Sequence, residues 1–202
     1  MSGCLALDKE IDEIRLRNDK PSLLLHCCCA PCATYVTQYL VSHFDITALF
    51  YNPNIDTKDE HDKRATELLK LPGIHTVGDS TGSVETIICE YDGKAFDEIK
   101  KAYPDEPEGG RRCELCYKLR LGETGKLARA EGFDYFATTL SVSPHKSAAL
   151  LNDIGKDIEM SYGVRYLPGD FKKRDGYKRS VELSKLYGLY RQAYCGCTPQ
   201  KG

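Results

Sequence analysis

Long apolar runs are missing from this sequence of 202 residues. A helix that spans a bilayer needs about 20 consecutive, mostly apolar residues, so we expect no membrane-spanning segment and no membrane partner. A secretory signal peptide is missing too, because the first residues, MSGCLALDKEIDE, carry acidic side chains where such a peptide has a basic segment followed by an apolar one. We therefore expect a cytoplasmic protein.

Glycine-rich nucleotide-binding motifs are also missing. The segment GETGKL (122–127) has leucine where a P-loop has Ser or Thr, and GDSTGS (78–83) lacks the glycine spacing of a dinucleotide site. The sequence contains no fingerprint for a bound flavin or nicotinamide. If the chain performs redox chemistry, we expect its electrons to come from an external donor, such as a ferredoxin- or flavodoxin-like protein.

Cysteine, in contrast, is abundant, with ten residues. Eight of them fall into three groups: Cys27, Cys28, Cys29 and Cys32; Cys113 and Cys116; Cys195 and Cys197. Disulfides are rare in the reducing cytosol, so the grouping points to metal binding or redox catalysis. Cys89 lies in an apolar run and is interpreted as a core residue, and Cys4 as an incidental residue of a mobile end.

Three kinds of site are compatible with these groups. A thioredoxin-like dithiol would use Cys29 and Cys32 and would leave the other two groups without a role. A structural zinc site takes four ligands and leaves several cysteines unexplained. An iron–sulfur cluster also takes four thiolates, and the roughly three sulfurs that remain suit a second metal. The number of cysteines therefore favours the cluster.

Strand-like and helix-like segments alternate along the chain. The expected strands are 22–27, 45–51, 74–77, 84–91, 133–141 and 165–171. The expected helices are 31–42, 57–71, 113–130, 143–158 and 180–194. This alternation predicts an α/β fold, with a mostly parallel sheet and helices on both faces. We expect a single domain over 1–202 that begins with an N-terminal extension at 1–20.

The cysteine-rich segment lies where such a fold binds ligands, which is beyond the carboxyl ends of the strands. HCCCAPC (26–32) follows the first expected strand, and YNPN (51–54) ends the second. Two histidines there have two interpretations each. His26 either orients a ligand or caps a buried strand, and His145 either contacts a substrate or lies in a surface loop.

The charge of the chain is unevenly distributed. A net charge of −2 argues against a uniformly basic nucleic-acid-binding protein, but residues 165–202 carry nine Lys or Arg and only three Asp or Glu. This basic C-terminal segment suits a polyanion held in one place. Its alternative interpretation is a solvated, lysine-rich helix.

Several segments resemble, in order, the motifs of the QueH-type epoxyqueuosine reductases. They are HCCCAPC, FYNPNI, RCELCYKLRL, FDYFATTLSVSPHK and DFKKRDGYKRSVELSKLYGLYRQAYCGC, and they cover about residues 22–197. The first motif of that family corresponds to His26, Cys28, Cys29 and Cys32, and Cys27 falls on its variable position. Where the family has His-Pro after NPNI, this chain has Asp56 and Thr57.

The resemblance implies a fold similar to that of the adenine-nucleotide α-hydrolase (HUP-like) group. It also implies a 4Fe–4S cluster with an adjacent mononuclear iron, and the two-electron reduction of epoxyqueuosine to queuosine in tRNA. The implied ligands of the cluster and the iron, taken jointly, are Cys28, Cys29, Cys32, Cys113, Cys116, Cys195 and Cys197. The basic segment 165–202 would complete this metal site.

Further roles are expected around these ligands. Asp56 is a candidate ligand that completes the iron site, and Tyr117 is a candidate proton donor whose alternative is a packed core tyrosine. The candidate phosphate contacts are Arg111, Arg112, Lys172, Lys173, Arg174, Lys178, Arg179 and Arg191. The candidates for stacking on an unpaired base are Tyr166, Phe171, Tyr177 and Tyr190.

Two functions of other classes stay open. One is a PP-loop-like iron–sulfur enzyme that inserts sulfur into tRNA, although such enzymes need a Ser-Gly-Gly-x-Asp-Ser loop where this chain has HCCCAPC. The other is a zinc-stabilised module that holds RNA through its basic segment. Tight ATP binding would favour the first, and a colourless protein with stoichiometric zinc would favour the second.

Overall fold

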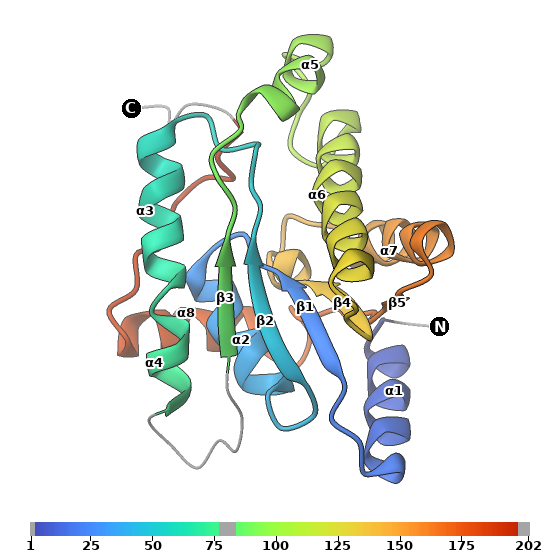
Figure 1. Cartoon of the computed structure of the whole chain (residues 1–202). Coiled ribbons are helices and arrows are strands. Elements are labelled where there is room, and N and C mark those ends of the chain that lie inside the picture. The colour runs from blue at the N-terminus through green and yellow to red at the C-terminus, as the bar shows by residue number, and fades with distance from the viewer. Residues whose placement is uncertain (1–2, 77–83, 198–202) are drawn as a thin grey trace.

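A computed structural model of the chain describes residues 3–76 and 84–197. Five parallel strands form one sheet in the order β3-β2-β1-β4-β5 (Figure 1). Their bounds are β1 Ser22–His26, β2 Asp45–Phe50, β3 Val84–Ile88, β4 Tyr135–Thr138 and β5 Arg165–Tyr166. The predicted α/β fold with a mostly parallel sheet is therefore confirmed.

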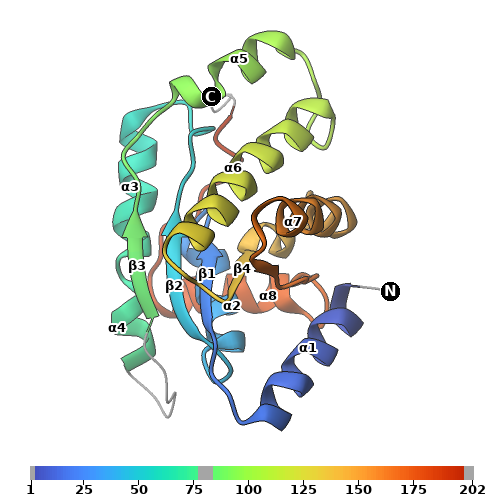
Figure 2. The same cartoon turned by 45° about the vertical axis from the view of Figure 1, so that its right-hand side comes forward.

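The central strand β1 supplies side chains to both faces of the sheet. Leu23 and Leu25 belong to one buried cluster and Leu24 belongs to the other, as expected for a strand with helices on both sides. The first cluster lies under α2 (Ala30–Leu40), α3 (Lys58–Leu68) and α4 (Leu71–Thr76), with α8 (Gly176–Leu186) packed on α2. The second lies under α5 (Lys94–Ala102), α6 (Arg111–Ala130) and α7 (Ala148–Tyr162), as Figure 2 shows for α6 and α7.

The described N-terminal residues, 3–20, are tied to the rest of the fold. They contain α1 (Gly3–Arg17), whose Leu7, Ile11 and Ile14 are buried in the first cluster. The expectation that Cys4 lies in a mobile end is wrong, because Cys4 is part of α1 and its Sγ lies 3.7 Å from the carbonyl oxygen of Asp170.

Three expected elements are corrected. Residues 74–76 belong to helix α4 rather than to a strand, because a short apolar run does not distinguish the two; residue 77 lies outside the described residues. Helix α7 begins at Ala148, not at residue 143, because the Oγ of Ser147 accepts a hydrogen bond from the Leu150 amide and caps the helix. Helix α8 spans Gly176–Leu186 rather than 180–194, and Gly188 after it has a φ of 59°.

The strand register brings three loops to one edge of the sheet. His26 at the end of β1 pairs with Leu49 of β2 and with Thr138 of β4. The segments that follow these strands, including the 3-10 helix η1 (Thr139–Val142), therefore meet beside the start of α2. Among the described residues, no helix has both the length and the apolar character that crossing a membrane requires.

A cysteine-lined candidate metal centre

A cavity of about 310 Å³ opens at the carboxyl edge of the sheet. Its walls come from the first turn of α2, the loop after β2, helices α3 and α6, the turn before α7, and the segment after α8. Its cysteine lining residues are Cys28, Cys29, Cys32 and Cys195, and its basic lining residues include Arg64, Arg120, Lys146 and Arg191. The predicted position of the site beyond the strand ends agrees with this cavity.

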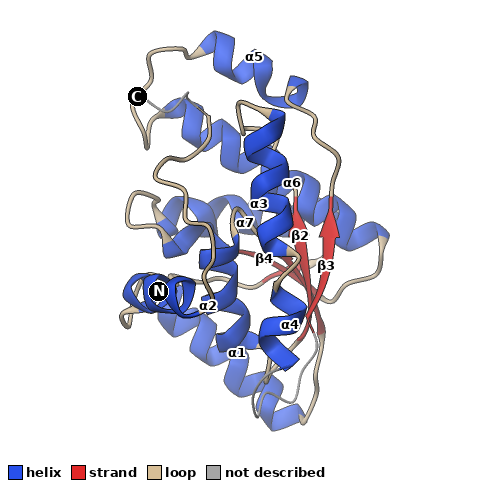
Figure 3. Cartoon of the chain, turned by 90° about the vertical axis from the view of Figure 1, so that its left-hand side faces the viewer, coloured by secondary structure: helices blue, strands red, loops and turns tan. Residues whose placement is uncertain are grey.

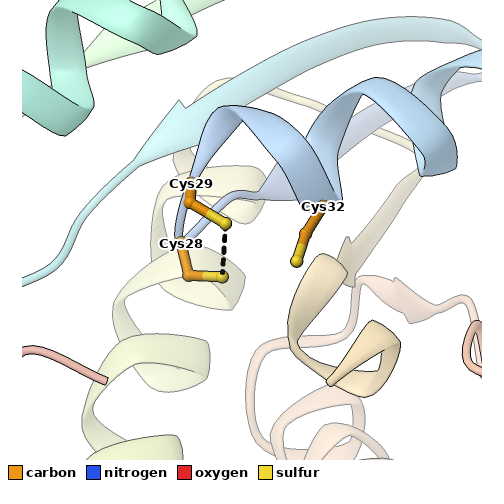
Figure 4. Close-up of side chains that lie close together, drawn as sticks. All are labelled: Cys28, Cys29 and Cys32. Carbon is orange, nitrogen blue, oxygen red and sulfur yellow. Dashed lines mark hydrogen bonds between the residues drawn. The ribbon is translucent and has the colours of Figure 1, made fainter. Parts of the chain in front are cut away.

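Three cysteines of the first motif share one small volume. The Sγ atoms of Cys28, Cys29 and Cys32 all lie within 4.8 Å of one another, and those of Cys28 and Cys29 are 3.7 Å apart (Figure 4). The cause is local: the backbone is extended at Cys29, and α2 begins at the next residue with Pro31 in its first turn. The helix N-terminus also favours negative charge on these sulfurs.

Cys27 points away from this group. Its side chain is fully buried in the first core cluster, and its Sγ lies 3.3 Å from the carbonyl oxygen of Leu25. Burial raises the pKa of its thiol well above the ordinary value. The structure thus separates Cys27 from its neighbours, as the resemblance implies.

The other two cysteine groups approach the same place. Cys113 and Cys116 are buried on α6, and Cys195 and Cys197 lie in the segment after α8. The thiol of Cys195 interacts electrostatically with Cys28 and with Cys116. Cys197 interacts with Cys116 in the same way and is hydrogen-bonded to Cys195. All ten cysteines are free thiols.

The surroundings make two of these sulfurs acidic. Hydrogen bonds from Cys29 and Cys32, with the nearby charges of Arg120 and Lys146, hold the pKa of Cys28 well below its usual range. A hydrogen bond from Cys197 and the same two cations lower the pKa of Cys195 to about 5. Metal ligation requires thiolates, and the lowered pKa values of Cys28 and Cys195 favour that form.

The sequence analysis did not identify these two buried cations. Arg120, whose residue is 1% exposed, donates to Asn52 Oδ1, and its Nη1 lies 3.9 Å from Cys116 Sγ. Lys146, 9% exposed, has its Nζ 3.7 Å from a carboxylate oxygen of Glu108. Cys113, Cys116 and Arg120 are spaced so that all three lie on one face of α6. This spacing is the feature of the sequence that could have identified Arg120 as a residue of the site.

His26 holds the sheet edge together and is not turned toward the sulfurs. Its Nε2 lies 3.1 Å from the carbonyl oxygen of Tyr51 and its Nδ1 lies 3.0 Å from Thr138 Oγ1. Burial lowers the pKa of the imidazole to about 3, so the ring is neutral. This geometry matches the interpretation of His26 as a buried residue at a strand end.

The two candidate catalytic residues lie behind the cavity wall. Neither Asp56 nor Tyr117 is one of the lining residues. The Asp56 amide donates to the Gly196 carbonyl over 2.8 Å, and its buried Oδ1 has no hydrogen-bond partner among the described residues. Tyr117 is buried on α6, and burial raises the pKa of its hydroxyl. A packed core tyrosine describes Tyr117 better than a proton donor does.

The candidate RNA contacts divide into exposed and buried residues. Arg191 is exposed at the cavity, and its guanidinium lies 5.2 Å from the centre of the Tyr177 ring, which also lines the cavity. Arg112 is buried and donates to the carbonyls of Tyr103, Pro104 and Glu106, so it holds its own loop rather than a phosphate.

Most of the other candidate RNA contacts are buried in the core or paired with other protein groups. Tyr166 and Phe171 are buried core residues, so the expectation that they stack on a base is wrong. Tyr190 is half-buried, with its hydroxyl bonded to Glu60. Four basic side chains form ion pairs with nearby acids: Arg111 with Glu114, Lys172 with Asp170, Arg174 with Asp8 and Arg179 with Glu182. Lys173 and Lys178 are exposed, and His145 lines the cavity from an exposed position.

The donor set fits an iron–sulfur group. Thiolates are the ligands that bind iron–sulfur clusters. Four free cysteines line the cavity, and Cys116 and Cys197 interact electrostatically with one of them, Cys195. Two polar atoms of cavity-lining residues, Arg120 Nε and Gln192 Oε1, are buried with no hydrogen-bond partner among the described residues. The geometry therefore leaves both sulfur and polar atoms free to contact a bound group.

Comparisons with known proteins identify relatives of this chain. The family described as "Epoxyqueuosine reductase QueH" matches residues 23–200. Proteins named "Epoxyqueuosine reductase QueH" from Streptococcus pyogenes and Staphylococcus epidermidis are 44% identical over 179 residues and 41% identical over 194 residues. These alignments cover 88% and 95% of this chain, and 69% and 81% of the relatives. A protein of the same name from Thermotoga maritima is 38% identical over 87% of this chain and 88% of its own length. The chain therefore belongs to the QueH family of epoxyqueuosine reductases.

Proposed function

We propose that this chain is an oxidoreductase that reduces epoxyqueuosine to queuosine in tRNA. In this reaction both carbon–oxygen bonds of the epoxide break, a carbon–carbon double bond forms, and the oxygen leaves as water. The reaction consumes two protons and two electrons, and the electrons come from an external ferredoxin- or flavodoxin-like donor. The tRNA substrate would place the reaction in the cytoplasm.

The group that we propose for this chemistry is a 4Fe–4S cluster with an adjacent mononuclear iron. Together they would be held by Cys28, Cys29, Cys32, Cys113, Cys116, Cys195 and Cys197, with Asp56, whose Oδ1 has no hydrogen-bond partner among the described residues, as a further iron ligand. When bound, this group supplies single electrons and a Lewis acid. The observation that carries the proposal is that Cys28, Cys29, Cys32 and Cys195 line one cavity in a member of this family, and that the buried Cys116 and Cys197 interact electrostatically with Cys195.

Lys146 is the side chain that we propose for contact with the reacting oxygen. Its side chain is nine-tenths buried and lines the cavity, and among the described residues it forms one ion pair, with Glu108. The pKa of this ammonium is raised; burial opposes the rise, and the Cys195 and Cys28 thiolates cause it. A fixed positive charge in a partly closed site stabilises an oxygen that gains negative charge. In this proposal Lys146 Nζ donates a hydrogen bond to that oxygen.

Arg191 and Tyr177 are the residues that we propose for the nucleobase at the cavity entrance. Both line the cavity and both are exposed. Aromatic rings and guanidinium planes stack on bases that have left the helical stack of RNA. Tyr177 would stack on the modified base and Arg191 would contact an adjacent phosphate, while the side chain of the base enters the cysteine-lined cavity.

The test is anaerobic purification, reconstitution with iron and sulfide, and activity on tRNA that carries epoxyqueuosine. The expected result is a coloured protein with more than four irons per chain that forms queuosine when a reduced donor is added. The Cys27→Ala variant is the matched control and should retain both properties. A protein without iron and acid-labile sulfide after reconstitution, or one with stoichiometric zinc and no reductase activity, would contradict the proposal.

A further inference from the structure

The segment after α8 carries Cys195 and Cys197, and it runs along the side of α3 (Figures 1 and 3). We call residues 189–197 the C-terminal strap. The strap contains no helix or strand, so its own backbone hydrogen bonds do not fix its position. Its place beside the cavity must come from contacts with the neighbouring elements.

Arg64 of α3 makes the most central of these contacts. The residue is only 2% exposed, and its Nη1 donates to the carbonyl oxygen of Cys195 over 3.0 Å. Its Nη2 lies 3.5 Å from the carbonyl oxygen of Tyr194, and its Nε donates to Glu60 over 2.7 Å. One guanidinium therefore spans from the surface of α3 to the backbone of a proposed metal ligand.

Two further anchors lie on either side of Arg64. At the start of the strap, the Tyr190 amide donates to Glu67 over 2.9 Å, and the Tyr190 hydroxyl donates to Glu60 over 3.1 Å. At its end, the Asp56 amide donates to the carbonyl oxygen of Gly196 over 2.8 Å.

Gly196 itself shows how tightly the strap fits. Its φ of 111° is a backbone conformation that favours glycine. A Cβ at this position would lie 3.2 Å from Ile55 and 3.4 Å from the Arg64 guanidinium. All these contacts are made between protein atoms.

We propose that Arg64 is a positioning residue that docks the C-terminal strap onto α3 before metal binds, and so sets the backbone of Cys195. The inference rests on the proposed function only in taking Cys195 and Cys197 as ligands. Its consequence is that metal binding does not have to order the strap. A buried hydrogen bond to a charged group contributes about 1.5–3 kcal/mol, so the loss of Arg64 should increase undocking about ten- to hundredfold.

The first measurement is amide hydrogen exchange in the metal-free, reduced protein. The reporters are the amides of Asp56 and Tyr190, which are protected only while the strap is docked. In Arg64→Met their exchange should accelerate about ten- to hundredfold, and in Arg64→Lys by an intermediate factor, because lysine keeps the charge beside Glu60 but loses the guanidinium fork. Arg129→Met, at an exposed site on α6, is the matched control and should leave the exchange unchanged.

The second measurement uses Co²⁺ alone as a probe of the thiolate site. Removal of bound Co²⁺ by a chelator should accelerate in Arg64→Met by about the same factor as the Asp56 exchange, with partial rescue in Arg64→Lys. The Leu25 amide in β1 reports general stability. Arg64→Met could accelerate amide exchange at Leu25 as much as at Asp56 by destabilising the whole fold. In that case the test is Arg64→Lys, which must accelerate amide exchange at Asp56 more than at Leu25.

Two results would overturn the inference. One is exchange at Asp56 and Tyr190 that is the same in both Arg64 variants as in the wild type. The other is a wild-type strap that exchanges freely without metal and becomes protected only when Co²⁺ is added. If the wild-type protein reconstituted with iron and sulfide were inactive on epoxyqueuosine, the proposed function would be wrong, but the hydrogen-exchange result would still stand. Failure of the proposed function can therefore be distinguished from failure of the role proposed for Arg64.

Discussion

Cys27 and Cys28 are adjacent in the chain, yet their thiols lie in different environments. Cys27 continues the alternation of β1 into the core, where its thiol contacts the Leu25 carbonyl. Cys28 lines the cavity, where hydrogen bonds with Cys29 and Cys32, together with the charges of Arg120 and Lys146, lower the pKa of its thiol. Two residues of identical chemistry therefore lie in separate settings: Cys27 packs in the core, and Cys28 is a proposed metal ligand.

This contrast gives a prediction for the pair. Cys27→Ala should retain the iron and sulfide content of the wild type and lower the free energy of unfolding by about 1 kcal/mol, because it removes a small buried group. Cys28→Ala should lose a large part of the bound iron. Metal analysis after anaerobic reconstitution, together with urea unfolding, checks both. Equal iron content in the two variants would contradict the assignment.

Close packing at one glycine gives a second prediction. A Cβ on Gly155 of α7 would lie 2.4 Å from the ring of Tyr166, whereas one on Gly122 of α6 would meet nothing within 4 Å. Gly155→Ala should lower the free energy of unfolding by about 1–3 kcal/mol through overpacking. Gly122→Ala should raise it by up to about 1 kcal/mol, because alanine favours the helix. Urea unfolding of both variants is the measurement, and a neutral Gly155→Ala would contradict the packing described.

At the scale of elements, ion pairs and hydrogen bonds join segments that are distant in sequence. The carboxylate of Asp8 in α1 accepts hydrogen bonds from both terminal nitrogens of Arg174, over 3.0 and 2.5 Å. This contact ties the N-terminal helix to the turn before α8. Together with the buried face of α1, it explains why residues 3–20 are part of the packed fold.

The pH dependence of this contact can be predicted from the direction in which the pKa of Asp8 shifts. The hydrogen bond from Arg174 lowers the pKa of Asp8 below 3.8, so the pair stabilises the fold above about pH 4 and loses its effect as the pH falls through the lowered pKa. Asp8→Asn should cost up to about 1 kcal/mol at pH 7, as for other surface ion pairs. Unfolding measured at pH 7 and pH 3 should show this difference shrink at pH 3; a constant difference would exclude the pair as its cause.

The whole molecule combines a net negative charge with basic residues at the cavity entrance. The net charge is −2, yet Arg191 lines the cavity and is exposed. RNA phosphates are attracted by such local positive charge, and the attraction is screened by salt. Binding of tRNA should therefore depend on a few cations near the cavity rather than on overall charge.

A prediction for RNA binding follows. Arg191→Ala should weaken the binding of tRNA and reduce the slope of log affinity against log salt by about one unit for one lost phosphate contact. A stacking contact without a phosphate would weaken binding and leave the slope unchanged. Arg129→Ala, at the far end of α6, is the control for general charge loss. Anaerobic binding titrations at several salt concentrations check the result, and equal effects of the two variants would contradict a specific contact by Arg191.

Local patterns accounted for the strands and the ligand candidates, because apolar runs and cysteine spacing are properties of short segments. Residues 74–76 form a helix instead of the expected strand because a short apolar run does not distinguish the two. Arg120 and Lys146 were missed because their burial beside the sulfurs depends on tertiary packing. Arg112 was assigned to phosphate for the same reason, since its carbonyl partners lie in a loop that the sequence does not place.

The separation of the three cysteine groups along the chain also sets the order in which the site is synthesised. Cys195 and Cys197 follow Cys116 by about 80 residues, which the ribosome adds in about 4–16 s at ordinary rates of translation. During that interval the first two groups exist without the third. Because the strap completes the cavity wall, the full set of proposed ligands can assemble only after the last of these residues has been translated.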